Sequence, residues 1–223
     1  MVSALFVHGV GVWTPRLPDV LAWRRSSAAG EFGEVDEAAR PVASILPAGQ
    51  RRRCSQLTRA MCEAAGQALT GAGCEPSELA TVFASAYGET ATMLELLAQI
   101  YDDGVLSPIR FGGSVHNTAS GQLSIATRNR GFTTSVAAGG ETPAMALFEA
   151  QGLLAAGHEQ VLVVLGDAAA PAPLVGEGGS FGVAAMALLL AARPAAGGLG
   201  SLHDLHIDDP RCDRGAPTAT WDA

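Results

Sequence analysis

The chain has 223 residues and a formal net charge of −8; 48% of its residues are hydrophobic and only 16% are charged. This length fits one domain with a substantial buried core, so we expect residues 1–223 to form a single domain, with residues 194–223 as a loosely ordered extension. The negative charge, relieved only by a short basic run at 51–53, argues against a nucleic-acid partner. The apolar excess indicates an extensive buried interface.

Apolar runs and turn residues predict strands that alternate with helices along the chain. We expect strands at 5–12, 81–85, 132–136, 160–165 and 182–191, and one more short strand near 202–207. We expect helices after Asp19, at 55–71 with Gly71 as the stop, at 89–101, within 113–128, and from 141 onward. This alternation is typical of an α/β layered fold with a mainly parallel sheet.

The most informative stretch is strand 132–136, the turn Ala137-Ala138-Gly139-Gly140, and the helix that follows. Pro143 fits the first turn of that helix, where its missing N–H costs nothing. Strand, tight turn and helix present one side chain at the positive end of a helix dipole, where a Cys or Ser nucleophile is favoured. The position belongs to Ala137, whose methyl group cannot attack a substrate.

Other motifs carry less chemistry. The G-x-S-x-G pattern at Ser180 has a loop before it and an apolar strand after it, the reverse of a hydrolase elbow. On a strand, Asp204, His206 and Asp208 would share one face, so a metal site is geometrically allowed there, although a solvated face is the commoner arrangement. We expect no metal and no cofactor.

The cysteines and the N-terminus indicate the cellular setting. No C-x-x-C spacing links the four cysteines, and we expect packed, reduced thiols at Cys54, Cys62, Cys74 and Cys212. No signal peptide is recognisable, and the longest apolar run, 183–192, is too short to span a bilayer. We expect a cytoplasmic protein that contacts no membrane.

Four motifs in order give the chain a family resemblance: residues 115–121 (VHNTASG), the turn at Ala137, residues 159–168 (EQVLVVLGDA) and residues 182–185 (GVAA). Over roughly residues 5–192 the sequence resembles the N-terminal half of a β-ketoacyl synthase. The resemblance implies half of a thiolase-type α/β fold, a five-stranded mixed sheet with helices on both faces. Ala137 matches the family's acyl-accepting Cys. The run 138–140 is similar to the silent chain-length factors of type II polyketide synthases, which often carry Gln at that position, so Ala137 departs from both patterns.

The resemblance also implies a function. The two His residues that ketosynthase chemistry needs belong to the family's C-terminal half, which this chain lacks, and His8 and His116 lie in the wrong motifs to replace them. We therefore expect no catalytic residue in this chain. We expect a non-catalytic chain-length factor that pairs with a full-length ketosynthase in a polyene-like type II polyketide pathway, with an acyl carrier protein reaching the complex through the partner.

The resemblance assigns two groups of residues to this role. In ketosynthase-like dimers, apolar segments line the far end of the acyl tunnel, and the matching residues here are Met93, Leu94, Leu97, Ile109 and Phe111. Without the resemblance, the same residues would be read as ordinary core residues. The subunits of the family join their sheets around the elbow strand, so we expect interface positions at Phe132, Thr133, Thr134, Ser135, Val136, His116 and Asn117.

Two alternatives remain open. A homodimeric scaffold of a synthase complex would leave products unchanged when Met93 or Phe111 is resized. A stand-alone acyltransferase or hydrolase would use Ser135 or Ser180 and would be labelled by a serine-reactive probe.

Overall fold

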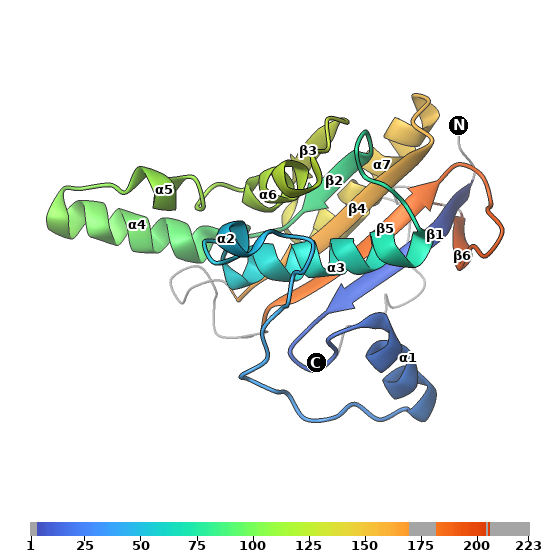
Figure 1. The fold of residues 1–223 in the computed structure, drawn as a ribbon, viewed down its shortest axis with the longest axis horizontal. Helices are drawn as coiled ribbons and strands as arrows, with labels where there is room; N and C mark the ends of the chain where they lie inside the picture. Colours follow the sequence, from blue (N-terminus) through green and yellow to red (C-terminus); the bar gives the residue numbers. More distant parts are fainter. Residues whose placement is uncertain (1–3, 170–181, 204, 206–223) are drawn as a thin grey trace, which may run out of the picture.

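The computed structural model describes residues 4–169, 182–203 and 205. They form one six-stranded sheet in the order β3-β2-β4-β5-β1-β6 (Figure 1). The strands are β1 (Ala4–Trp13), β2 (Ala80–Ala84), β3 (Thr133–Val136), β4 (Gln160–Asp167), β5 (Ala184–Ala191) and β6 (Gly200–His203). The predicted α/β class with a mixed sheet is confirmed, and each predicted strand lies within a few residues of an observed one.

The strand count and the strand directions differ from expectation. The sheet has six strands rather than five because β6 pairs antiparallel with β1 at the edge farthest from β3. A mainly parallel sheet is wrong: β2 is parallel to β3 and β4, but β4–β5, β5–β1 and β1–β6 are antiparallel. A continuous apolar run shows that a strand is buried, but it does not show whether the strand runs parallel or antiparallel to its neighbours, which is why the expectation of a mainly parallel sheet was wrong. The extension expected at 194–223 contains β6, and most of the rest lies outside the described residues.

Helices cover both faces of the sheet, as expected. Their bounds are α1 (Val20–Ala29), α2 (Ala48–Arg51), α3 (Gln56–Ala72), α4 (Thr90–Asp103), α5 (Pro108–Phe111), α6 (Thr118–Thr127) and α7 (Thr142–Ala155). One buried cluster joins α3 and α6 to β2, β4 and β5, through side chains such as Leu69, Leu123 and Leu162. A second cluster joins α7 to the opposite face of the sheet, through Ala146, Ala150 and Val163. The chain therefore has three layers, helix, sheet and helix.

Helix α3 approaches β1 unusually closely. A bulge after Val7 changes the face that β1 presents, so that Gly9 and Gly11 turn toward α3. A Cβ atom at Gly11 would overlap the carbonyl oxygen of Ala64, and one at Gly9 would overlap that of Ala68. Glycine is required here to let a helix backbone lie against a strand backbone.

Capping residues set the ends of α1 and α3. The Asp19 carboxylate accepts the Ala22 N–H (2.7 Å), and the Ser55 hydroxyl accepts the Thr58 N–H (2.9 Å). Helix α3 passes through the predicted stop at Gly71 and ends at Gly73, whose φ is 61°. Gly71 has no left-handed φ, so it continues the helix, whereas Gly73 supplies the left-handed residue that ends it.

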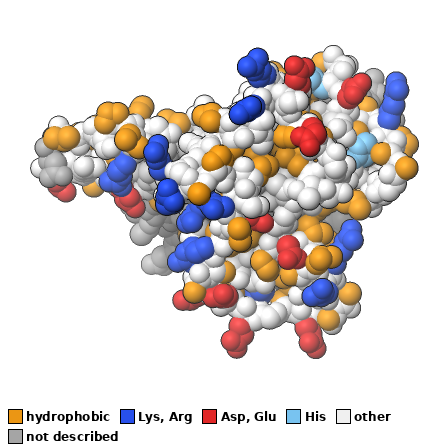
Figure 2. All heavy atoms as spheres, in the orientation of Figure 1, with side chains coloured by type: hydrophobic (Ala, Val, Ile, Leu, Met, Phe, Trp, Pro, Cys, Tyr) orange, Lys and Arg blue, Asp and Glu red, His pale blue; other side chains and the backbone are white. Residues whose placement is uncertain are grey.

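Helices α4 and α5 form an arm that projects beyond the sheet (Figure 1). The sequence predicted α4 but not the four-residue α5. Arg110 of α5 bonds Glu95 (2.8 Å) and Gln99 (3.2 Å) of α4, so the two helices are fastened to each other. Figure 2 shows hydrophobic side chains spread along this arm.

Replacing Gly11 with alanine should destabilise the fold. The added methyl group must displace α3, and overpacking of this kind costs about 1–3 kcal/mol of unfolding free energy. Gly71→Ala is the matched control, because a Cβ there meets nothing within 4 Å, and a helical alanine gains up to about 1 kcal/mol. Urea denaturation measures both variants. Equal stability of Gly11→Ala and the wild type would contradict this packing.

Candidate functional site

The elbow has the geometry of a nucleophile site. Strand β3 ends at Val136, a single 3₁₀ turn follows (η1, Gly139–Glu141), and α7 begins at Thr142 with Pro143 in its first turn. The Thr142 hydroxyl accepts the Ala138 N–H (2.9 Å) and donates to the Gly139 carbonyl (2.7 Å), which fixes the turn. Gly139 has a φ of 55°, a conformation that favours glycine. Ala137 is thereby held exposed ahead of the positive end of α7.

The elbow offers no nucleophile at this point. Ala137 has only a methyl group, and the nearby Ser135 is half-buried with its hydroxyl 3.3 Å from the hydroxyl of Ser120. Ser120 in turn donates to the Asn117 carbonyl (2.9 Å). A serine nucleophile needs a base within hydrogen-bond reach, and the partner of Ser135 is another hydroxyl. Ser180 lies outside the described residues.

Strand β3 is an open edge of the sheet. The carbonyls of Phe132 and Val136 accept the N–H groups of Thr81 (2.9 Å) and Ser85 (3.2 Å) across the β2–β3 pair. Backbone groups alternate in direction along a strand, so the N–H and C=O groups of Thr133 and Ser135 point away from β2. Among the described residues, β3 pairs only with β2, so these outward groups of the expected interface strand are available to another strand.

A polar network lies behind the elbow and supports the turn after β2. Asp167, at the end of β4, accepts hydrogen bonds from the Ser85 hydroxyl (2.6 Å) and from the N–H groups of Ala86 and Tyr87 (3.0 Å each). His116 Nε2 bonds the Ser85 carbonyl (2.8 Å). Helix α6 begins at Thr118, within the predicted range 113–128, so His116 precedes the helix and packs against the turn. Asn117 is exposed beside it.

The proposed tunnel residues lie together on the arm. Exposed fractions are 41% for Met93, 52% for Leu97, 74% for Ile109 and 53% for Phe111, while Leu94 is half-buried. They are therefore not ordinary core residues, because this chain leaves them at its surface. Sequence reasoning missed two further exposed apolar residues between the arm and β3, Val115 and Ile125, whereas Phe132, which is 46% exposed, was among the expected interface positions.

The described residues contain no group of three or more His, Cys, Asp or Glu side chains that could hold a metal ion. His203 is in β6, whereas Asp204, His206 and Asp208 lie outside the described part of the chain. Cys54, Cys62 and Cys74 are free thiols, and burial raises the pKa of each. None of the described helices is long and apolar enough to cross a membrane.

Residues 21–199 match the family described as beta-ketoacyl synthase, N-terminal domain, and the chain therefore belongs to this family. A search of curated proteins finds no match. The predicted family resemblance is confirmed, and with it the assignment of the fold as a ketosynthase half of thiolase type.

Solved structures resemble the chain along most of its length. A chain of a ketosynthase in complex with its chain length factor from Xenorhabdus doucetiae is 26% identical, with a TM-score of 0.70 over 84% of this chain and 79% of that one. The ishigamide ketosynthase/chain length factor is 17% identical, with a TM-score of 0.71 over 84% and 62%. A chain from the complex of a type II polyketide synthase acyl-carrier protein with its ketosynthase is 14% identical, with a TM-score of 0.66 over 85% of this chain and 62% of that one. This protein thus spans less than two thirds of the matched chains in these last two structures.

A thiol introduced by Ala137→Cys should be unusually reactive. The positive end of the α7 dipole favours the thiolate and lowers the pKa of a thiol there. Ala155→Cys is the matched control, because Ala155 is also exposed but ends the same helix. At pH 7 we expect alkylation by iodoacetamide to be at least about tenfold faster at position 137 than at 155. Equal rates, read by mass spectrometry, would contradict the elbow geometry.

Proposed function

We propose that this chain is a non-catalytic, ketosynthase-like chain-length factor. It pairs with a full-length ketosynthase, which supplies the nucleophilic Cys and both His residues. This chain contributes an interface and part of the wall of the acyl tunnel. An acyl carrier protein delivers the acyl chain to the complex, docking mainly on the partner.

One observation carries the proposal: the strand, turn and helix of the elbow are present, and the position that the family resemblance assigns to the nucleophile is Ala137. A methyl group can neither accept an acyl chain nor be activated by a base. The turn, the exposed position of Ala137 and the helix dipole are all present, although they serve no catalytic purpose without a nucleophile. An interface built by this strand, turn and helix would explain why they are present.

The comparison with Xenorhabdus doucetiae supports this role. The two coverages, 84% and 79%, are nearly equal, so the matched chain of that ketosynthase and chain-length-factor complex is close to this chain in length. The other two matched chains are longer, with 62% of each covered. The similarity therefore includes a chain of comparable size in a complex of the proposed kind.

The open edge of β3 supports a seam at this strand, meaning the line along which the sheets of the two subunits would join. Two residues, Thr133 and Ser135, offer outward N–H and C=O groups, and Phe132 is 46% exposed beside them. A strand from the partner would pair these groups and extend the sheet across the interface. His116 and Asn117 lie at the start of α6, which packs on β3, and would border that seam.

The exposed arm supports the tunnel wall. An isolated protein gains nothing from apolar side chains at its surface, whereas a partner subunit would cover them. Met93, Leu97, Ile109 and Phe111 would then close a shared cavity, with Leu94 behind them. A packed wall limits chain length by steric exclusion, because an extra two-carbon unit does not fit without displacing side chains.

Co-expression with a ketosynthase, followed by size-exclusion chromatography with mass measurement, tests the pairing. A one-to-one complex supports the proposal. A homodimer that ignores the ketosynthase would favour the scaffold alternative, and labelling of Ser135 or Ser180 by a serine-reactive probe would favour an enzyme.

Thr133→Pro should weaken the complex while leaving the chain folded. The substitution removes an N–H that faces the open edge and takes part in no pairing with β2. We expect at least about tenfold weaker binding to the ketosynthase. Thr133→Val is the control, because it removes the hydroxyl bonded to Thr81 and keeps the N–H. Titration by interferometry compares them, and equal affinities would exclude the seam at β3.

Shrinking the arm side chains should lengthen the product. Met93→Ala or Phe111→Ala opens space in the wall, and we expect the main product to grow by about one two-carbon unit. Leu21→Ala is the control, since Leu21 is 61% exposed but lies on α1, away from the arm. Mass spectrometry of the products from the reconstituted complex measures the lengths. An unchanged product length with both arm variants would show that the arm does not line the tunnel.

A further inference from the structure

A buried carboxylate lies at the root of the arm. Glu89 is only 7% exposed and directly precedes α4, the longer helix of the arm. Burial of a charged group costs free energy unless hydrogen bonds replace its water. No part of the tunnel wall or of the β3 seam uses this residue, so its burial needs another explanation.

Hydroxyl groups from both α3 and α4 donate hydrogen bonds to this carboxylate. Ser55 and Thr58 of the α3 N-terminus donate to Glu89 Oε1 at 2.6 and 2.7 Å. Thr92, in the first turn of α4, donates to Oε2 at 3.3 Å. Among the described residues, Glu89 makes no ion pair. The Glu89 side chain thereby connects the start of α4 in the arm to the start of α3, which packs on the sheet.

The backbone before Glu89 is constrained as well. Gly88 has a φ of 55°, and a Cβ there would lie 2.9 Å from Cδ2 of His116. The Gly88 N–H donates to the Ser85 hydroxyl (2.7 Å), which itself donates to Asp167. The turn between β2 and α4 is thus rigid up to Gly88, and Glu89 is the first residue of the arm.

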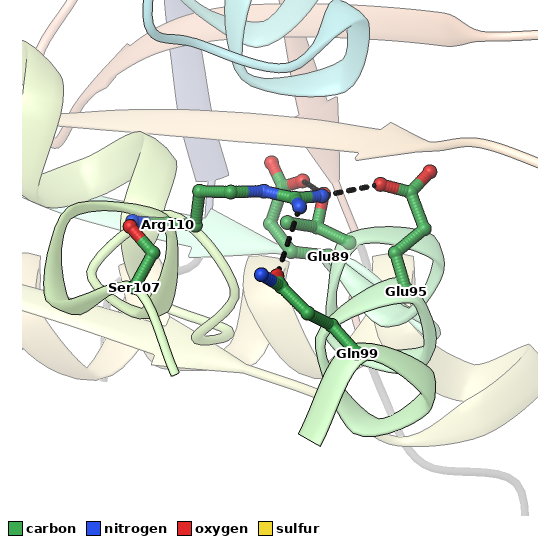
Figure 3. Close-up of polar contacts among 6 residues, drawn as sticks. Glu89, Glu95, Gln99, Ser107 and Arg110 are labelled. Carbon is green, nitrogen blue, oxygen red and sulfur yellow. Dashed lines mark hydrogen bonds and ion pairs between the residues drawn. The ribbon is translucent and has the colours of Figure 1, made fainter. Parts of the chain in front are cut away.

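The far end of the arm is attached to α4 through one side chain of α5. Figure 3 shows Arg110 directed toward Glu95 and Gln99, which fastens α5 onto α4. This contact is exposed, and exposed ion pairs hold geometry weakly. It also joins two parts of the arm to each other and not to the body, so it cannot set the direction of the arm.

We propose that Glu89 is the positioning residue of the arm: its bonds to Ser55 and Thr58 fix the direction in which α4 leaves the sheet. Through that direction, Glu89 sets the distance between the exposed apolar side chains of the arm and a partner subunit. Its effect on product length rests on the proposed function; its effect on the arm does not.

Amide hydrogen exchange of the chain itself tests the attachment. Glu89→Leu keeps the volume but leaves the hydroxyls of Ser55 and the fully buried Thr58 without their acceptor, so amides of α4 should exchange at least about tenfold faster. Glu89→Gln should behave like the wild type, because its amide oxygen accepts the same hydroxyls. Helix α7 is the internal reference. Unchanged exchange in α4, or an equal increase in α7, would overturn the proposal.

Product analysis in the reconstituted complex tests the consequence. A loosened arm should widen the distribution of product lengths without shifting it by a fixed unit, and Glu89→Gln should restore a single main length. Asp102→Leu is the control, because that carboxylate is on the same helix, is exposed and takes no part in the contact between α4 and α5. Equal widening by Glu89→Leu and Asp102→Leu would overturn the positioning role. Failure of the wild-type chain to pair with a ketosynthase would instead refute the proposed function and leave the exchange result intact.

Discussion

The proposed interface depends on β3 being an edge strand of the described sheet. The N–H and C=O groups of Thr133 and Ser135 face away from β2, and exposed edges of this kind are templates for pairing with another chain. The elbow continues directly from this strand, so an interface at β3 places Ala137 beside the partner. In the proposed complex, the methyl group of Ala137 would supply no nucleophile to that interface and would leave its geometry unchanged.

The arm and the edge act together. Helix α6 connects them, since it follows the arm in the chain and packs on β2 and β3. Exposed apolar side chains occur at Ile109 and Phe111 on the arm, at Val115 before α6 and at Phe132 before β3. A partner that covered them would account for the high hydrophobic content of the chain. Glu89 at the root of the arm keeps the two parts in a fixed relation.

The sequence predicted the elements well because their apolar periods and caps are local. Asp19, Ser55 and Pro143 each mark a helix start by chemistry confined to one turn. Strand direction, the sixth strand and α5 depend on contacts between distant segments, such as β6 with β1, and no local pattern contains them. Ala137 could be located from the turn alone. The exposure of Met93 and Leu97 could not, because the same helical period suits a core and an arm. Glu89 was not singled out, since its role appears only when α3 and α4 meet.

In the proposed complex, this chain borders an acyl chain that it does not itself carry. The most direct measurement is photo-crosslinking in the reconstituted complex, with a diazirine at the far end of an acyl group loaded onto the ketosynthase. We predict adducts on the arm, at α4 or α5, and no acyl group covalently attached to this chain in the dark. Adducts confined to the ketosynthase, or an acyl ester on a serine of this chain, would contradict the account.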